Sequence, residues 1–179
     1  MTQIGSVYGQ ALYDLTREEC ETQEILSQLA VLDESFRREP AVVRLLSTPN
    51  LSKQERCRII DESFHGKVHA YVLNFLKILT EKGYMRHFSD CCASFRNLYN
   101  QDHNILPVTA VTALPLTQEQ SLRLTDKLAR ITGKNIELIN RVDPSVLGGM
   151  RLDYDGKRLD DTVAHRLEAV RSLLKNTVL

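Results

Sequence analysis

Tryptophan is absent from this sequence, and aromatic residues make up only 6% of its 179 positions. The few aromatic side chains are not interleaved with basic ones, as they are in proteins that stack the bases of single-stranded nucleic acid. Net charge is also missing, because 23 Lys and Arg residues balance 23 Asp and Glu residues. Such a chain has no general attraction for nucleic acid or anionic lipid. We therefore expect protein partners and no nucleic acid.

Long apolar runs are absent as well, and a membrane-spanning helix needs about 20 consecutive apolar residues. The best candidate, residues 71–79, is interrupted by Asn74 and Lys77. The first residues contain neither the basic and apolar regions of a secretory signal nor the many arginines of a transit peptide. These observations predict a cytosolic protein.

Cysteine is scarce, and the four cysteines at positions 20, 57, 91 and 92 form no Cys-x-x-Cys pair. Three of them fall on apolar faces of predicted helices, which indicates core thiols in a reducing compartment. The adjacent Cys91 and Cys92 leave a redox pair open as an alternative, although both point toward the same apolar stripe.

Motifs of catalysis and cofactor binding are not found. Gly148 and Gly149 lack a following Lys-Ser or Lys-Thr and the dinucleotide spacing, so a bulge or a close backbone approach explains them. His65 and His69 are four residues apart, but Gly66 breaks the helix between them, which disfavours a metal site. No serine lies in a Gly-x-Ser-x-Gly elbow, although a catalytic group assembled from distant residues stays open. We expect no catalytic, cofactor-binding or metal-binding residues, which favours a binding module.

The first 104 residues contain six segments with the apolar spacing of amphipathic helices, joined by short connections. Pro40 and Pro49 end the second and third segments, and Ser52 with Glu55 forms a capping box that begins the fourth. This pattern predicts an all-α, six-helix bundle as an N-terminal domain over residues 1–104.

The fifth predicted helix, residues 68–81, has more apolar surface than one core face requires. Four apolar residues share one stripe, and three others lie well off it, namely Tyr71, Leu73 and Ile78. Such a helix is either central in a bundle or has a second face for a partner.

After residue 104 the apolar period changes. Residues 105–114 are rich in Val and Thr and predict a strand, and residues 136–142 predict a second one. Between them, a helix is expected from its cap Thr117 to its stop Gly133. Three residues of that helix are predicted to face inward: Leu124, Leu128 and Ile131.

The last segment has the period of a hairpin followed by a helix. Apolar and charged residues alternate over 150–155, Asp155 and Gly156 are typical of a turn, and residues 157–159 can return as a partner strand. Beyond them, four apolar residues on one face predict an amphipathic terminal helix: Val163, Leu167, Val170 and Leu174. Residues 105–179 thus form a small predicted α/β domain, and the whole chain is predicted to be an α+β two-domain protein.

The C-terminal segment resembles a known family. The order Asp-Pro-Ser-Val-Leu-Gly-Gly-Met at residues 143–150, a strand, and Asp-Asp-Thr-Val-Ala-His-Arg-Leu-Glu at residues 160–168 is similar to the signature of the delta subunit of bacterial F-type ATP synthase, the relative of the mitochondrial oligomycin-sensitivity-conferring protein. Near the start, Tyr-Gly-Gln-Ala-Leu at residues 8–12 is similar to the family's Tyr-Ala-x-Ala-Leu. The turn at residues 47–52 also resembles the family's turn before its fourth helix.

This resemblance implies a binding site for the N-terminal segments of the alpha subunits of the catalytic head. In the family the site is a groove between the first and fifth helices. The matching positions here are Tyr8, Ala11, Leu12, Leu15, Asn74, Phe75, Ile78 and Leu79. Core burial and partner contact both stay open for Leu12, Phe75 and Leu79, whereas partner contact is favoured for Ile78.

The resemblance also implies that the C-terminal domain binds the b subunits of the peripheral stalk. The chain would then be a non-catalytic stator subunit, monomeric in isolation and present in one copy per complex. It would lie at the cytoplasmic face of the bacterial plasma membrane through its partners and couple rotation to ATP synthesis and ion transport.

One departure from the family and two alternative functions are part of this interpretation. The family usually has Asn-x-Arg after the fifth helix, whereas this chain has Lys82, Gly83 and Tyr84, with Arg86 two positions later. The alternatives are a helical adaptor with an unrelated protein partner and a hydrolase that assembles histidines and carboxylates in space.

Overall fold

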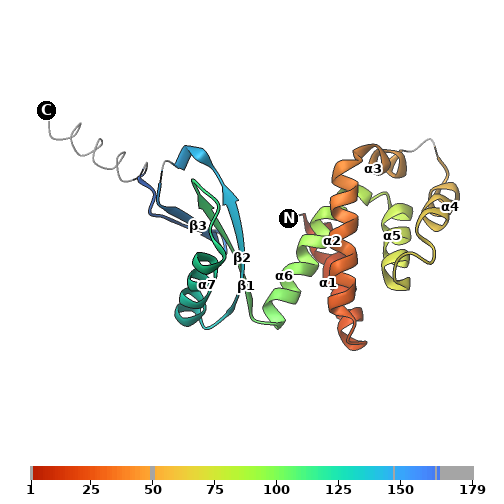
Figure 1. The fold of residues 1–179 in the computed structure, drawn as a ribbon. Coiled ribbons are helices and arrows are strands. Elements are labelled where there is room, and N and C mark those ends of the chain that lie inside the picture. The colour runs from red at the N-terminus through yellow and green to blue at the C-terminus, as the bar shows by residue number, and fades with distance from the viewer. Residues whose placement is uncertain (1, 49–50, 147, 164, 166–179) are drawn as a thin grey trace, which may run out of the picture. The chain divides into compact units, whose positions relative to one another are not determined.

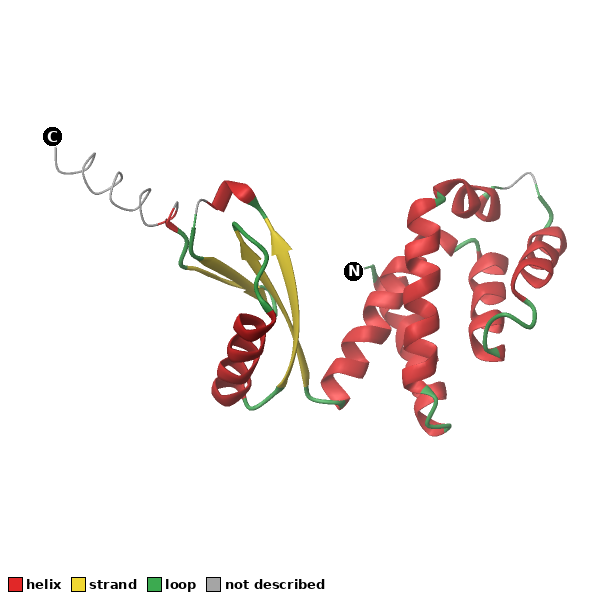
Figure 2. Cartoon of the chain, viewed as in Figure 1, coloured by secondary structure: helices red, strands yellow, loops and turns green. Residues whose placement is uncertain are grey.

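The computed structural model describes residues 2–48, 51–146, 148–163 and 165. Over these residues the chain has seven α-helices and one four-stranded sheet, which confirms the α+β class (Figure 1). The chain divides into two compact units, Met1–Gln101 and Asp102–Leu179. Figure 2 shows that the first unit is helical and that the second contains the sheet. Among the described residues, no helix combines the length and apolar character that crossing a bilayer requires.

The helices of the first unit begin and end at signals in the sequence. Ser52 Oγ accepts the Glu55 N–H at 3.2 Å and Glu55 Oε2 accepts the Ser52 N–H at 2.9 Å, so the predicted capping box is present. Gly83 ends the fifth helix in the left-handed conformation, with φ of 73°. The helices are α1 Gln3–Glu18, α2 Thr22–Arg38, α3 Pro40–Ser47, α4 Lys53–Phe64, α5 Ala70–Lys82 and α6 Phe88–Asp102, with a short 3₁₀ helix, η1 Met85–His87, before α6.

Aromatic pairs and aliphatic side chains fill the core of the first unit. Phe36 and Phe88 pack edge-to-face with 5.1 Å between ring centroids, and Tyr13 and Phe95 do so at 5.2 Å. Each large apolar side chain that is buried contributes about 1.5–3 kcal/mol, so this set dominates the stability of the unit. The fully buried aliphatic residues include Ile25, Leu29, Ile60, Leu76 and Leu79.

Helix α1 crosses α6 at close range because two of its residues have no side chain. A Cβ atom added at Gly5 would lie 2.5 Å from Cβ of Asp90. One added at Gly9 would lie 2.6 Å from the carbonyl oxygen of Cys91 and 2.7 Å from Cβ of Ser94. Protein interiors are packed too densely to accept such overlaps without movement of the backbone. The separation of α1 and α6 therefore requires glycine at both positions.

The second unit is built around β1, which pairs in parallel with β2 and antiparallel with β3. The strand order is β2-β1-β3-β4, and α7 lies against one face of the sheet (Figure 1). The predicted strand-helix-strand order and the hairpin are both present. The bounds are β1 Ile105–Thr112, α7 Gln118–Thr132, β2 Asn135–Val142, η2 Pro144–Val146, β3 Met150–Tyr154 and β4 Lys157–Asp160.

The core of the second unit lies between the sheet and α7. Alternate residues of β1 are buried together with Leu152 of β3, and Leu124 and Leu128 of α7 pack against them. The prediction that Ile131 also faces inward is wrong, because its side chain is 71% exposed. Ile131 continues the apolar spacing into the last turn of α7 but does not belong to the set of side chains packed against the core of the sheet. The buried residues of β1 are Leu106, Val108 and Ala110.

The two adjacent glycines hold the chain that leaves the hairpin. A Cβ atom at Gly149, whose φ is 80°, would lie 2.5 Å from the carbonyl oxygen of Asp161, which is a close backbone approach of the kind predicted. The Asp161 N–H donates to the Met150 carbonyl at 3.1 Å, and the Val163 N–H donates to the Gly148 carbonyl at 3.0 Å. The segment after β4 is thereby fixed beside the start of β3.

Thr162 has the contacts of a helix N-cap. Its hydroxyl donates to Asp160 Oδ1 at 2.7 Å and accepts the His165 N–H at 3.2 Å. Most of the terminal helix predicted over residues 163–174 lies outside the described residues.

Replacing Gly9 with alanine should destabilise the first unit, although alanine is the better helix former by about 1 kcal/mol. The added methyl group has to push α6 away, and overpacking of this kind costs about 1–3 kcal/mol. Urea unfolding followed by far-ultraviolet circular dichroism measures the change. Gln10→Ala, on the exposed side of α1, is the matched control. A Gly9→Ala variant as stable as the parent would show that the two helices separate without cost.

Candidate functional site

Helices α1 and α5 contact each other and run in opposite directions. At one end, Tyr8 of α1 packs edge-to-face on Tyr84, which follows α5, with 5.8 Å between ring centroids. At the other end, the Tyr71 hydroxyl of α5 donates a hydrogen bond to the Glu19 carboxylate, and this bond raises the pKa of Tyr71. With a helical rise of about 1.5 Å per residue, these end contacts place the middle of α1 beside the middle of α5.

The eight residues predicted to bind a partner lie on these two helices, and the structure divides them by exposure. Leu12 and Phe75 are each only 6% exposed and Leu79 is not exposed, so these three belong to the core of this chain. In contrast, the side chains of Leu15 and Ile78 are 43% and 44% exposed. The five residues that reach the surface, Tyr8, Ala11, Leu15, Asn74 and Ile78, form the α1–α5 face.

The excess apolar surface of α5 is mostly used inside the chain. Leu73, which lies off the predicted stripe, is buried. Lys77 forms an ion pair with Asp61 of α4 at 2.6 Å, so this side of α5 is directed toward α4. Of Tyr71, Leu73 and Ile78, which lie off the predicted stripe, only Ile78 is exposed. Most of the apolar surface of α5 is thus packed inside the unit, and one large apolar side chain, Ile78, is exposed.

His69 holds the N-terminal end of α5, and the sequence analysis did not identify this role. Its Nδ1 accepts the Tyr71 N–H at 3.3 Å, and its backbone N–H donates to Gln28 Oε1 at 2.7 Å. Its Nε2 lies 3.0 Å from Glu21 Oε2. One residue therefore ties α5 to the turn between α1 and α2. Histidine is not among the preferred N-cap residues, so no local signal marks it.

Tyr84 closes the other end of the α1–α5 face. It is half-buried between Tyr8 and His87, whose ring centroid lies 6.3 Å from that of Tyr84. The resembling family usually has an arginine at this position.

The two adjacent cysteines lie in the core, as the favoured interpretation predicts. Burial raises the pKa of Cys91 to about 12 and also raises that of Cys92. The Cys92 thiol donates to the carbonyl oxygen of Leu29, with 3.9 Å between the two atoms. Protonated, buried thiols are poor nucleophiles, which disfavours a redox pair.

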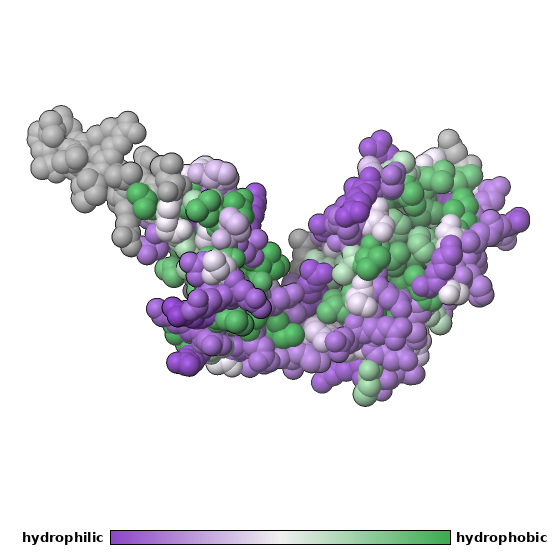
Figure 3. Space-filling view, in the orientation of Figure 1, coloured by the Kyte–Doolittle hydropathy of each residue, from purple (hydrophilic) through white to green (hydrophobic). Residues whose placement is uncertain are grey.

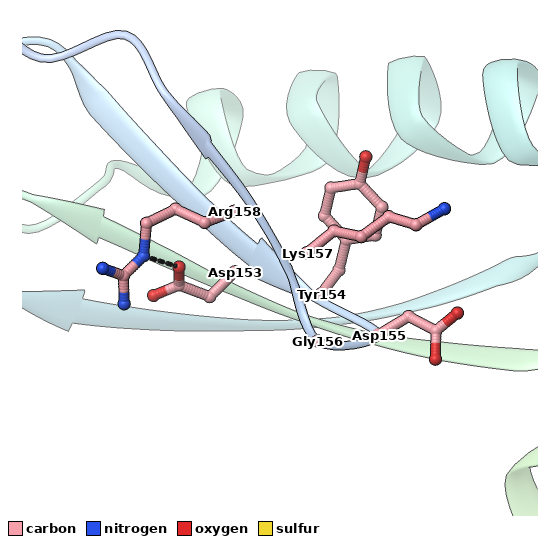
Figure 4. A pocket seen from close by; sticks show the side chains of 6 residues that line it. All are labelled: Asp153, Tyr154, Asp155, Gly156, Lys157 and Arg158. Carbon is pink, nitrogen blue, oxygen red and sulfur yellow. Dashed lines mark hydrogen bonds and ion pairs between the residues drawn. The ribbon is translucent and has the colours of Figure 1, made fainter.

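A pocket at the tip of the β3–β4 hairpin is lined by residues 153–158 (Figure 4). Two of its charges are paired with each other, because Asp153 accepts from Arg158 Nε at 2.8 Å; Asp153 also accepts from Arg151 Nε, outside the pocket, at 3.3 Å. The hydrogen bond from Arg158 is the main reason that the pKa of Asp153 is lowered. Within the described part of the chain, no group of three or more His, Cys, Asp or Glu side chains is arranged to hold a metal ion.

The fold defines a class: a two-unit protein in which a helical unit, with Leu15 and Ile78 exposed on adjoining helices, is followed by a unit built on a four-stranded sheet. Residues 4–174 match the family model described as ATP synthase delta (OSCP) subunit. The chain is similar to the ATP synthase subunit delta of Alkaliphilus oremlandii, with 31% identity over 176 residues and 98% of each chain covered. It is also similar to that of Prochlorococcus marinus (strain MIT 9301), with 30% identity over 168 residues and 93% of each chain covered.

A solved structure has the same fold. A chain of the Toxoplasma gondii mitochondrial ATP synthase hexamer superposes with a TM-score of 0.75 at 16% identity, covering 97% of this chain and 98% of that one. The chain described here belongs to the ATP synthase delta (OSCP) subunit family. It is a structural stator subunit of the peripheral stalk, serves ATP synthesis and ion transport, and is not catalytic.

Alanine substitutions at neighbouring positions of α5 should separate core from surface. Leu79→Ala removes a fully buried side chain and should lower the free energy of unfolding by about 2–5 kcal/mol. Ile78→Ala, at an exposed position, should cost less than about 1 kcal/mol. Urea unfolding of both variants provides the comparison. Equal losses would contradict the assignment of Leu79 to the core and Ile78 to the surface.

The stability of the second unit should fall in acid. Hydrogen bonds from Arg158 and Thr162 lower the pKa of Asp153 and Asp160, respectively. Below the ordinary carboxyl pKa of about 3.9, the unfolded chain binds protons that the folded unit excludes, so stability is lost as pH falls toward the lowered values. Asp160→Asn should reduce this pH dependence, and Asp155→Asn at the hairpin turn should not. Urea titrations at several pH values, monitored by the NMR signals of the second unit, measure it.

Proposed function

We propose that this chain clamps the catalytic head of the ATP synthase to its peripheral stalk, with each unit gripping one partner. The six helices of the first unit act as one bundle that binds the N-terminal segments of the alpha subunits. The second unit binds the b subunits. One copy serves each complex, at the cytoplasmic face of the bacterial plasma membrane, and the isolated chain is a monomer.

The observation that carries this proposal is the exposure of Leu15 and Ile78 on two adjoining helices. Their neighbours Leu12, Phe75 and Leu79 are buried, so the two exposed side chains lie next to residues that are packed in the core. An amphipathic helix that lays its apolar side on such a surface is a common recognition mode. The large apolar side chains then become buried anchors, which carry most of the energy of a protein interface.

For the second unit, exposed apolar residues support a role in protein binding. In Figure 3, apolar residues interrupt the hydrophilic surface of the visible side of this unit. They are found on α7, on the edge strand β2 and on the loop between β1 and α7. The widely exposed ones include Leu114, Leu122, Ile131 and Ile139.

Replacing Ile78 with aspartate should weaken binding of the alpha subunit's N-terminal segment. A charge at a buried anchor opposes desolvation, and we expect at least about a tenfold loss of affinity, which is 1.4 kcal/mol. The measurement is isothermal titration of the full chain with a synthetic peptide copying the first twenty or so residues of the alpha subunit of the same organism. Val31→Asp is the matched control, because Val31 is an exposed apolar residue of α2 outside the α1–α5 face.

Two control measurements complete this test. Circular dichroism should show unchanged helix content in both variants, because both positions are exposed. Binding of the soluble part of the b subunit should be unchanged in Ile78→Asp if the second unit holds that partner. An Ile78→Asp variant that binds the alpha peptide normally would remove this residue from the interface and overturn the assignment of the α1–α5 face.

A further inference from the structure

Strand β2 lies at one edge of the sheet, and among the described residues no strand pairs with its outer side. It is 8 residues long, whereas β4 at the opposite edge has 4. A long edge is usually protected, because its unpaired N–H and C=O groups can bind a strand of another chain. However, β2 contains no proline, and its pairing with β1 runs without a bulge. This edge can therefore accept a further strand.

The hydrogen bonds of β2 show which of its residues face the free edge. The Asn135 N–H donates to the Asn104 carbonyl at 2.9 Å, and the Asp143 N–H donates to the Thr112 carbonyl at 2.9 Å. Backbone groups of successive strand residues point to opposite sides, so the odd-numbered residues of β2 are bonded toward β1. The N–H and C=O groups that face outward are those of the even-numbered residues, Ile136, Leu138, Asn140 and Val142.

The side chains of β2 are divided between the two faces of the sheet. Ile136 and Leu138 pack against the core together with α7. Because side chains alternate along a strand, Glu137, Ile139 and Arg141 lie on the other face. All three are exposed, Ile139 to 52%. An acidic and a basic residue are thus placed symmetrically about an exposed apolar one, which makes the strand complementary to an antiparallel copy of itself.

We infer that the occupant of this edge is a second copy of the chain, bound through its own β2. The two strands pair antiparallel about a two-fold axis that passes between the two copies of Ile139. Glu137 of each chain then lies opposite Arg141 of the other. On the side of α7, Ile136 lies opposite Val142. The two four-stranded sheets become one continuous sheet.

The charges select this register among those that the backbone allows. Residues opposite each other in an antiparallel pair either both bond to the partner strand or both bond away from it, so even-numbered residues must face even-numbered ones. A pair centred on Glu137 or on Arg141 places like charges directly opposite each other, which is destabilising. A pair centred on Asn140 places Glu137 opposite Asp143. Centring on Ile139 is the arrangement in which both charges meet the opposite sign.

The interface is small, because one strand contacts one strand. Interfaces well below the size found in stable dimers are weak. We therefore expect the copies to associate as their concentration rises, while the chain in dilute solution is a monomer. The pairing concerns copies outside the complex, and it does not depend on the proposed function.

Cross-linking of the full chain at position 139 tests the pairing. Residues that face each other without mutual hydrogen bonds have Cα atoms about 4.5 Å apart, which is within the range of a disulfide. Ile139→Cys, made together with Cys20→Ser, should therefore form a disulfide-linked dimer in oxidised glutathione. Asn135→Cys in the same background is the matched control, because it is exposed on the same face of β2 but lies opposite Asp143. Equal yields of dimer at the two positions, or no dimer from Ile139→Cys, would overturn the inferred pairing.

Charge reversal tests the register independently. Glu137→Arg and Arg141→Glu each place like charges opposite each other in both symmetric pairs, so each variant should self-associate roughly tenfold more weakly than the parent. A mixture of the two variants should associate as the parent does, because every facing pair is then opposite in sign. Asp14→Arg, at an exposed position of α1, is the control for a change of net charge.

Sedimentation equilibrium over a range of concentrations measures the association. Recovery in the mixture also shows that both variants are folded, since an unfolded chain has no strand to pair. A mixture that associates no better than either variant alone would contradict the register centred on Ile139. A parent chain that stays monomeric at every concentration would reject the pairing and leave the proposed function intact.

Discussion

The close approach of α1 to α6 is the constraint on which the first unit depends. Gly5 and Gly9 leave the backbone of α1 against α6, with no space for a methyl group at either position. Once α1 is fixed there, Leu12 and Tyr13 point into the core, and Tyr8 lies on an adjoining side of the helix, toward the end of α5. The position of the proposed binding residues of α1 thus depends on the absence of a side chain at Gly5 and Gly9.

Helix α5 packs into the core and also exposes one large apolar side chain. One side of α5 is buried in the core, and Lys77 on another side forms an ion pair with Asp61 of α4. The side chain of Ile78 is exposed. A stator subunit has to resist torque, and exposed ion pairs such as Arg58–Glu62 add little stiffness. The rigidity of the α1–α5 face comes instead from the buried residues next to it and from two contacts at its ends. These are the aromatic contact of Tyr8 with Tyr84 and the close pair of His69 with Glu21.

Local signals predicted most of the fold, and contacts between distant residues account for what was missed. The capping box at Ser52 and the glycine stop at Gly133 depend only on residues a few positions apart, so they could be read from the sequence. The exposure of Ile131 depends on where the sheet ends, which its periodicity does not contain. Likewise, the spacing on α5 separated Ile78 from the stripe that contains Leu79, but it left core burial and partner contact both open for Leu79, because that choice depends on the helices packed around α5. The N-cap His69 was not predicted, because its role requires Glu21 and Gln28 from other elements.

The hydrogen bonds that join the segment after β4 to the residues around Gly149 have a mechanical consequence. The segment after β4 is bonded to Gly148 and Met150, and β3 is bonded in turn to β1. A pull on the chain beyond residue 165 therefore does not open the β3–β4 hairpin one bond at a time from its free end. The pulling force is shared among several hydrogen bonds and is transmitted to the central strand, β1. In a stator subunit, the glycine pair thus allows the close backbone contacts through which a force on the C-terminal segment reaches the sheet.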